Sequence, residues 1–220
     1  MNVELRSYNP DPEKNIEFNA RICYDSHSKI SEDSYKSFLP TLMKNGHLSI
    51  FEHSWASFYI DGISRAASHQ LVRHRIASFT QRSQRYVTES HFEYIVPDSV
   101  AASPQALALY EGAMKSLQEG YRLLLEMGIR KEDARFLLPN ATPTSLTITA
   151  NFREWLHIID LRVSPHAQWE IREMCAVVWK RLYQIAPIVF GPTYFQHWSK
   201  DFDYKLKIFQ EEIAILDPRD

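Results

Sequence analysis

The chain is 220 residues long, 45% of its residues are hydrophobic and 24% are charged, and its formal net charge is −2. A chain of this length and apolar content can bury a substantial core, and its slightly acidic balance argues against a surface that attracts nucleic acid or anionic lipid as a whole, so any anion site must be local. The N-terminus lacks the apolar segment of a secretory signal, and no run approaches the roughly 18 apolar residues of a membrane span, so we expect a cytoplasmic protein without a membrane segment.

In the N-terminal part, short strands and helices are expected to alternate. The stretch WASFYID, residues 55–61, places Ala56, Phe58 and Ile60 at every second position, which is typical of a strand with two differently solvated faces. A helix is expected to follow from about Ser64 to Arg75. Residues 3–8 are a further strand candidate, and residues 11–24 and 33–45 are predicted to be helices.

The C-terminal part contains two segments with the three- and four-residue spacing of an amphipathic helix, residues 106–124 and 171–185. FEYIV, residues 92–96, and SLTIT, residues 145–149, are strand candidates, and FDYKLKIFQEEIAIL, residues 202–216, is predicted to be a peripheral helix or strand. The buried stripes are expected to consist of Ala106, Tyr110, Ala113, Leu117, Tyr121 and Leu124 in the first helix and of Ile171, Cys175, Val178, Leu182 and Ile185 in the second.

No repeat, low-complexity tract or long linker divides the chain. Proline-containing breaks at residues 97–104, 139–144 and 186–192 are typical of turns between packed elements. We therefore predict that residues 1–220 form a single domain of the α+β class, with several helices packed around a small, mainly antiparallel sheet.

The two cysteines, Cys23 and Cys175, form no CxxC pattern and are interpreted as buried thiols. The spacing of His47, His53, His69 and His74 differs from the helical HExxH pattern, and no acidic pattern completes a ligand set, so no metal site is predicted. The five tryptophans are expected in the core or at a subunit interface rather than against a cofactor.

The segment RHRIASFTQRSQRY, residues 73–86, concentrates arginine and histidine in a chain that is otherwise slightly acidic. On the predicted helix, Gln70, Arg73 and His74 would share one face while Arg75 points about 100° away. Residues 78–86 are expected to be an extended loop or irregular strand. Guanidinium groups bind phosphate bidentately and hydroxyls add hydrogen bonds to the same oxygens, so the composition favours a site for a phosphorylated small molecule.

Three other interpretations of this segment stay open. A solvated cationic surface is the ordinary outcome for a run of charges, although the lack of acidic residues within the segment argues against it. A nucleotide- or RNA-binding module would need aromatic residues interleaved with the basic ones, and only Phe79 and Tyr86 lie there. A phosphate-ester hydrolase would need clustered carboxylates for metal, and residues 62–88 contain none.

Arg73-His74-Arg75, seven residues, and then Ser83-Gln84-Arg85 fit the pattern RHR-x7-S-x-R. Five fixed identities at fixed offsets would arise by chance on the order of once in several million windows. The pattern resembles the signature of the flavin-dependent thymidylate synthases, and the resemblance covers about residues 46–172. Further matching segments are GHLSIFEH (46–53), ARFLLP (134–139), NFREWLHIIDLR (151–162) and HAQWEIR (166–172).

The resemblance implies reductive methylation of dUMP, with 5,10-methylenetetrahydrofolate as the carbon donor and NADPH as the hydride source by way of FAD. It also implies a homotetramer with FAD held between subunits, and it implies neither a nucleic-acid partner nor a metal. Gln81 stands where many family members have Glu, so its contact with nucleotide or flavin would come from a neutral group. The implied flavin contacts are Ser49, Arg73, His74, Arg75, Gln81, Asn151, Arg153 and His157. The implied dUMP contacts are Gln70, Arg73, Gln81, Ser83, Gln84, Arg85, Arg135 and Arg162.

By the same resemblance, Arg162 sits against the uracil ring. A fixed guanidinium there could stabilise negative charge on the O4–C4–N3 side of the ring as C5 becomes nucleophilic, so Arg162 is the expected catalytic residue. A cysteine nucleophile would need an exposed, activated thiolate, which neither cysteine provides by its sequence context. His166 and Gln168 could cap a helix or bind ligand, and Glu52 and His53 could brace the loop that carries Ser49.

Overall fold

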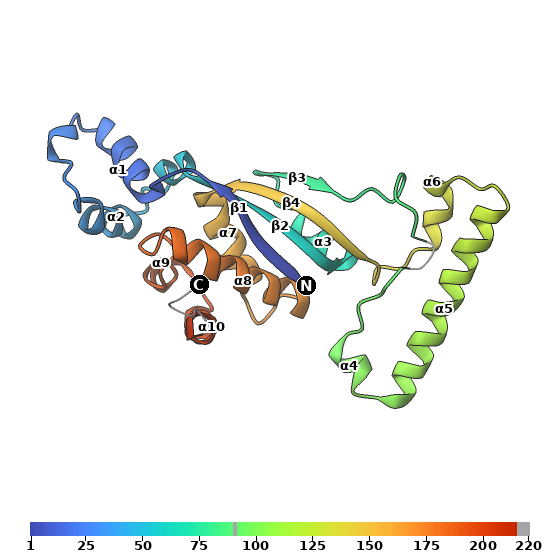
Figure 1. The fold of residues 1–220 in the computed structure, drawn as a ribbon. Coiled ribbons are helices and arrows are strands. Elements are labelled where there is room, and N and C mark those ends of the chain that lie inside the picture. Colours follow the sequence, from blue (N-terminus) through green and yellow to red (C-terminus); the bar gives the residue numbers. More distant parts are fainter. Residues whose placement is uncertain (90–91, 215–220) are drawn as a thin grey trace. The chain divides into compact units, whose positions relative to one another are not determined.

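The computed structural model describes residues 1–89 and 92–214, which form an α+β structure of helices and one sheet (Figure 1). In this part of the chain the sheet has four strands in the order β1-β2-β4-β3. β2 and β4 run antiparallel, because Phe152 N bonds Ser54 O at one end and Arg65 N bonds Thr142 O at the other. The predicted fold class is therefore confirmed. The strands are β1 (Asn2–Tyr8), β2 (Trp55–Ser64), β3 (Ala77–Gln81) and β4 (Pro143–Asn151).

The prediction of a strand at residues 92–96 is wrong. These residues have no regular secondary structure. Gln118 donates from Nε2 to Phe92 O at 2.5 Å, and Tyr110 donates its hydroxyl to Ile95 O at 2.7 Å. Side chains of a helix thus take backbone carbonyls that a neighbouring strand would otherwise bond, and the apolar composition of the segment serves burial of Phe92 instead.

The chain divides into two compact units whose segments alternate along the sequence. The first unit contains Met1–Asn2, Ile60–Arg73 and Thr80–Leu146, and the second contains Val3–Tyr59, His74–Phe79 and Thr147–Asp220. The prediction of a single domain over residues 1–220 stays a prediction. The RHR-x7-S-x-R pattern is divided between the units, since Arg73 and Ser83 belong to the first and His74 to the second.

In the first unit, the predicted long helix is α5, which begins after Ser103, whose side chain accepts from Ala106 N. Its predicted buried stripe is partly wrong, because Met114 and Tyr121 are the buried residues of α5 and Ala113 is exposed. α5 packs beside α6 and η3, as Figure 1 shows for α6. The helices of this unit are α3 (Arg65–Leu71), α4 (Asp98–Ala101), α5 (Pro104–Glu126), α6 (Lys131–Ala134) and the 3₁₀ helix η3 (Arg135–Leu137).

α3 ends earlier than predicted, at Leu71 rather than Arg75. Ser64 caps its first turn by accepting from Ala67 N at 3.0 Å, as a helix start requires. Beyond Leu71 the chain turns and buries the ring of His74 in the second unit. Gln70, Arg73 and His74 therefore do not share a helical face, because the tertiary contact of His74 overrides helix continuation.

The second unit contains the helices predicted at residues 11–24 and 33–45, and residues 202–214 form a helix rather than a strand. Residues 215 and 216 of that predicted segment lie outside the described residues. The elements are α1 (Pro12–Ile22), η1 (His27–Lys29), α2 (Tyr35–Lys44), η2 (Ser49–His53), α7 (Phe152–Arg162), α8 (Trp169–Ile185), α9 (Thr193–Trp198) and α10 (Phe202–Ala214).

Aromatic residues hold α7 against β2 in the core of the second unit. The ring of Trp155 meets that of Phe58 edge to face at 5.1 Å, and its Nε1 donates to Ala56 O at 3.1 Å. Ala56 and Phe58 are fully buried, as predicted for one face of β2, but Ser57 on the other face is buried as well, so the predicted alternation is only partly confirmed. Trp155 and Trp179 are core residues, as predicted for tryptophan. For the exposed Trp55 and Trp198 a subunit interface stays the prediction.

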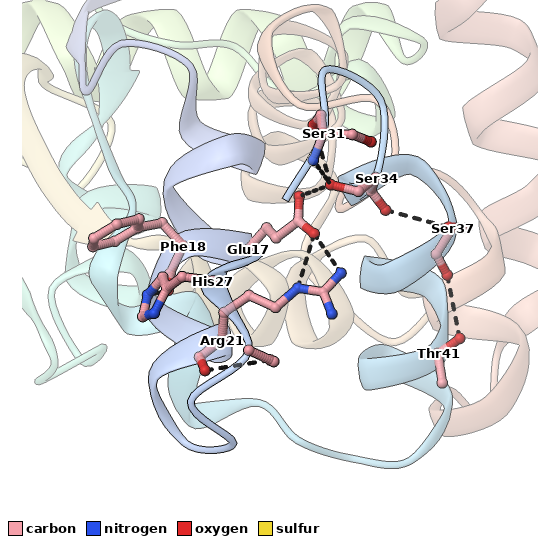
Figure 2. A network of polar contacts seen from close by, with 9 residues as sticks. Glu17, Phe18, Arg21, His27, Ser31, Ser34, Ser37 and Thr41 are labelled. Carbon is pink, nitrogen blue, oxygen red and sulfur yellow. Dashed lines mark hydrogen bonds and ion pairs between the residues drawn. The ribbon is translucent and has the colours of Figure 1, made fainter. Parts of the chain in front are cut away.

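A buried carboxylate fastens α1 to the start of α2 (Figure 2). Glu17 accepts from Arg21 Nε and NH2 at 3.1 and 2.7 Å and from Ser34 Oγ at 2.8 Å. The guanidinium of Arg21 also lies over the Phe38 ring, 3.9 Å from its centroid. One turn earlier on α1, Glu13 accepts from the backbone N–H groups of Ile188 and Val189. Two acids on one face of α1 thus anchor this helix.

The cysteine prediction is half right. Cys175 on α8 is buried, as its place in the apolar stripe predicted, and Ile171, Val178 and Leu182 of the same stripe are fully buried. Cys23 is exposed, because it follows the last residue of α1 in a turn.

Candidate active site

The second unit contains a buried polar group built from α7 and the residue at the centre of the arginine-histidine motif. Arg162 in the last turn of α7 donates from Nε to Nε2 of His74 at 3.0 Å. On the other side of the ring, Nδ1 of His74 lies 3.4 Å from Oε1 of Glu154 in the first turn of α7. The ring of His157 meets the His74 ring edge to face at 5.7 Å. Three predicted ligand contacts, His74, His157 and Arg162, are therefore neighbours.

Burial keeps the His74 ring neutral. Burial, followed by the positive charge of Arg162 and the neighbouring His157, lowers the pKa of His74 to about 4. Because Arg162 Nε is always a donor, Nε2 of His74 must be the acceptor, and the proton of the neutral ring lies on Nδ1, facing Glu154. Burial also raises the pKa of Glu154. The site therefore holds a defined histidine tautomer between an arginine and a carboxyl group.

A hollow of about 440 Å³ opens beside this group. Asn151, Arg153 and His157, all predicted flavin contacts, line it together with Ile76 and Tyr194. Asn151 caps α7 by accepting from Glu154 N at 2.8 Å, so its side chain is fixed. Arg153 donates to Glu52 at 2.6 Å, and both of these side chains are about half exposed. The sequence indicated Glu52 as a brace for its loop, and the structure adds an ion pair with Arg153.

Ser49, His74 and Arg75, the other predicted flavin contacts in the second unit, do not line this hollow. Ser49 is exposed at the start of η2, and Arg75 is exposed in the turn before β3, next to the hollow residue Ile76. Gln168, for which capping and ligand binding were both open, caps α8 by accepting from Ile171 N at 3.1 Å. His166 is exposed and its backbone N–H bonds Ser164 Oγ.

In the first unit, the predicted phosphate contacts gather around Glu132. Arg85 donates from Nε and NH2 to Glu132 Oε2 at 3.2 and 3.0 Å, and Arg135 donates from Nε to the Glu132 carbonyl at 3.1 Å. The Ser83 hydroxyl accepts from Arg85 N at 3.3 Å. Arg85 thus contacts the carboxylate of Glu132 and Arg135 contacts its backbone carbonyl, while the Ser83 hydroxyl contacts the backbone of Arg85. A hollow of about 340 Å³ is lined by Arg85, Tyr86, Arg130, Lys131 and Glu132.

The other predicted nucleotide contacts take different positions in the first unit. Gln81 is half-buried at the end of β3, and its Nε2 donates to Ser68 Oγ at 2.9 Å and Thr144 Oγ1 at 3.3 Å. Gln70 on α3 and Gln84 after β3 are half-buried, and Arg73 is exposed. The amide of Gln81 is thus held by its own unit, with its oxygen as the acceptor that remains for a ligand.

Three acidic partners of the site were missed in the sequence. Glu132 pairs with Arg85, Glu89 pairs with Arg82 at 3.2 Å, and Glu154 faces His74. The segment of residues 73–86 was interpreted as lacking neighbouring acids, and that interpretation is wrong. Glu132 and Glu89 lie outside the segment in the sequence, but in the structure they pair with Arg85 and Arg82 of the segment. Glu154 had a usable signal, since it lies eight residues before Arg162, about two helical turns.

Cys175 has no features of a nucleophile. Burial raises the pKa of its thiol to about 12, against a smaller lowering effect of Arg162. Among the described residues no group of three or more His, Cys, Asp or Glu side chains is arranged to hold a metal ion. No helix in the described ranges is long and apolar enough to cross a membrane.

Comparison with known proteins gives consistent matches over most of the chain. Residues 4–188 match the family described as thymidylate synthase complementing protein. The flavin-dependent thymidylate synthase of Geobacter sulfurreducens is 43% identical over 198 residues, which covers 86% of this chain and 85% of that protein. The flavin-dependent thymidylate synthase of Pyrococcus abyssi is 41% identical over 196 residues, 84% of this chain and 79% of that protein. That of Mycobacteroides abscessus is 36% identical over 217 residues, 91% of this chain and 83% of that protein.

Proposed function

The chain belongs to the family of flavin-dependent thymidylate synthases, which are methyltransferases, and from this premise we propose that it catalyses the reductive methylation of dUMP to dTMP. The carbon donor is 5,10-methylenetetrahydrofolate, and NADPH is the source of the hydride. When bound, FAD supplies the redox chemistry that connects NADPH to the nucleotide. The observation that carries the proposal is the match to this family over residues 4–188.

The hollow of the second unit supports the flavin part of the proposal. Its donors are the Arg153 guanidinium, which is paired with Glu52, and the Nδ2 group of Asn151, whose oxygen is used by the helix cap. Its walls include Ile76 and Tyr194 and the acidic residues Glu52, Glu154 and Asp160. Amide and guanidinium donors beside apolar and aromatic walls suit the ring system of a flavin. We assign Asn151, Arg153 and His157 to FAD, with Ser49, His74, Arg75, Arg73 and Gln81 as further contacts.

The cationic group of the first unit supports the nucleotide part. Arg85 bonds the Glu132 carboxylate and Arg135 bonds the Glu132 backbone carbonyl, and two guanidiniums with a serine hydroxyl can surround a phosphate dianion. A bound phosphate would compete with the Glu132 carboxylate for Arg85. We assign Ser83, Arg85 and Arg135 to the dUMP phosphate, and Gln70, Arg73, Gln81 and Gln84 to the rest of the nucleotide.

We propose Arg162 as the catalytic residue. A guanidinium beside the pyrimidine stabilises the negative charge that builds on O4, C4 and N3 while C5 attacks the carbon donor, and it does so without giving up a proton. Neither cysteine acts as a nucleophile on C6 in this proposal. The raised pKa of the buried Cys175 and the lack of a cationic neighbour in the contacts that the structure describes for Cys23 support that view.

A homotetramer with active sites between subunits is part of the proposal. Large apolar side chains of the first unit are exposed in the single chain, with Leu109 at 77%, Met127 at 73% and Phe136 at 84%. Exposed apolar surface of this kind commonly marks an interface between subunits. We also propose a cytoplasmic location, which suits two cysteines that remain free thiols.

Absorption spectroscopy of the purified protein tests the proposal. The protein should be yellow, or become so with FAD, and should oxidise NADPH and form dTMP when dUMP and methylenetetrahydrofolate are supplied. A colourless protein that ignores FAD but retains uridine nucleotides would contradict the proposal and favour a nucleotide-binding module.

A further inference from the structure

The contacts of His74 connect both ends of α7. Its Nδ1 lies 3.4 Å from Glu154 in the first turn and its Nε2 accepts at 3.0 Å from Arg162 in the last turn. The two side chains of the first contact are shielded from solvent, since that of His74 is 4% exposed and that of Glu154 is 10% exposed. A buried imidazole with a different group on each nitrogen has its tautomer fixed by those groups.

We propose that Glu154 is a positioning residue of this enzyme, acting through His74 to fix the orientation of the Arg162 guanidinium. Oε1 of Glu154 lies 3.4 Å from Nδ1 of His74, so the carboxyl group favours a proton on Nδ1 and leaves Nε2 as the acceptor that Arg162 Nε requires. This inference rests on the proposed function of Arg162, and it gives a role toward Arg162 to a residue that also lines the hollow assigned to FAD.

The bond to His74 uses Nε of Arg162. A guanidinium held by Nε is fixed in its plane, so the direction in which its positive charge faces the pyrimidine is fixed as well. If the opposite tautomer formed, Nε2 would carry a proton toward Arg162 and the two donors would repel each other.

The backbone on both sides of Glu154 is held in place by hydrogen bonds. Asn151 accepts from the Glu154 backbone N–H at 2.8 Å, and the next residue, Trp155, is fastened to Ala56 of β2. The first turn of a helix also stabilises a carboxylate through its free N–H groups. The ionisable groups that face His74 are Glu154, His157 and Arg162 from α7, and Cys175 of α8 interacts with Arg162. Because burial keeps His74 neutral, Glu154 sets a tautomer rather than holding an imidazolium.

The test compares Glu154→Leu with Glu154→Gln in the FAD-bound oligomer. Leucine removes the acceptor, whereas glutamine can present its carbonyl oxygen to Nδ1 and so acts as the conservative control. Two measurements are made on each protein. One is the ¹⁵N and ¹H spectrum of histidine- and arginine-labelled protein, with the His74 ring and Arg162 Nε signals assigned by the losses in His74→Gln and Arg162→Lys. The other is turnover and KM for dUMP.

We expect Glu154→Leu to lose the Nδ1–H pattern of His74 and to shift the Arg162 Nε–H signal. Its turnover should fall on the order of tenfold or more with little change in KM, as happens when a carboxylate behind a metal-binding histidine is lost. Glu154→Gln should retain both signals and most turnover. Unchanged His74 and Arg162 signals in a folded Glu154→Leu protein would overturn the inference, as would equal losses in Glu154→Leu and Glu154→Gln. A wild-type protein that shows the Nδ1–H pattern but forms no dTMP would count against the proposed function and leave the positioning contact standing.

Discussion

Nε of Arg162 lies 3.0 Å from Nε2 of His74, although the two residues are 88 positions apart in the sequence. The contact connects the centre of the arginine-histidine motif to the last turn of α7. Two segments that the sequence indicated separately, one for flavin and one for the uracil ring, therefore meet in one buried group.

We predict different kinetic losses for Arg162 and Ser83. Arg162→Ala removes charge stabilisation that is needed mainly in the transition state, so turnover should fall by about 10²–10³ with a smaller change in dUMP affinity. Ser83→Ala removes one hydroxyl from the phosphate group, and dUMP affinity should fall by roughly tenfold with turnover retained. Steady-state kinetics and dUMP binding measure both. Equal affinity losses with intact turnover in both variants would contradict this division of roles.

Both cysteines should be dispensable for dTMP formation. Burial raises the pKa of Cys175 to about 12, so its thiolate is scarce at neutral pH, and Cys23 lies in an exposed turn. The double variant Cys23→Ser, Cys175→Ala is expected to keep most of the wild-type turnover, with a stability loss of about 1 kcal/mol from the small cavity at Cys175. The assay is dTMP formation by the purified double variant, with circular dichroism as the folding control. A folded double variant without activity would show that a thiol is required.

The sequence predicted those elements whose pattern is set by local periodicity. The stripe around Cys175 and the buried face formed by Ala56, Phe58 and Ile60 are patterns that burial imposes directly, and both are confirmed, although Ser57 on the other strand face is buried too. α3 and residues 92–96 were mispredicted because tertiary contacts decide them: burial of His74 ends the helix, and α5 side chains take the carbonyls of the expected strand.

The candidate site was predictable to the extent that a motif specified it. Ser83, Arg85 and Arg135 were indicated by resemblance, and in the structure Arg85 and Arg135 both contact Glu132, while their role in phosphate binding stays a prediction. Their acidic partner Glu132 was not foreseen, because pairing across 47 positions leaves no periodic signal in the sequence. Glu154 lies in the segment NFREWLHIIDLR, whose resemblance to the family indicated ligand contacts at other positions, and its place opposite His74 was not predicted.

Stability should fall in mildly acidic solution because of His74. Its folded-state pKa of about 4 lies below the ordinary value of 6.5, so the unfolded chain binds more protons between these two values. The contribution of the neutral His74 ring to the free energy of unfolding is therefore complete above pH 6.5. It is lost as the pH falls toward 4, by up to about 3 kcal/mol. Urea unfolding of the wild-type protein and of His74→Gln, at the same protomer and FAD concentrations, isolates this contribution of His74. A wild-type minus variant difference that stays constant from pH 7 to pH 4 would contradict it.

Glu13 should stabilise the second unit as a hydrogen-bond acceptor rather than as a charge. Its Oε1 accepts from Ile188 N at 2.7 Å and from Val189 N at 3.0 Å, and its side chain is buried. Burial raises the pKa of Glu13, an effect only partly offset by these two bonds, so the folded state favours the protonated carboxyl. Glu13→Leu leaves both N–H groups without an acceptor and should cost about 2–4 kcal/mol of unfolding free energy.

Glu13→Gln is the matched control, because its amide oxygen can accept both bonds without a buried charge. A raised folded-state pKa means that the stabilising contribution of Glu13 is present at low pH and declines as the pH rises through that value. Glu13→Gln should therefore match or exceed the wild-type stability at pH 7, and its advantage should shrink as the pH falls toward 4.5. Urea unfolding of the three proteins at both pH values measures these differences. A Glu13→Gln variant as unstable as Glu13→Leu at pH 7 would mean that the negative charge itself holds the 188–189 backbone.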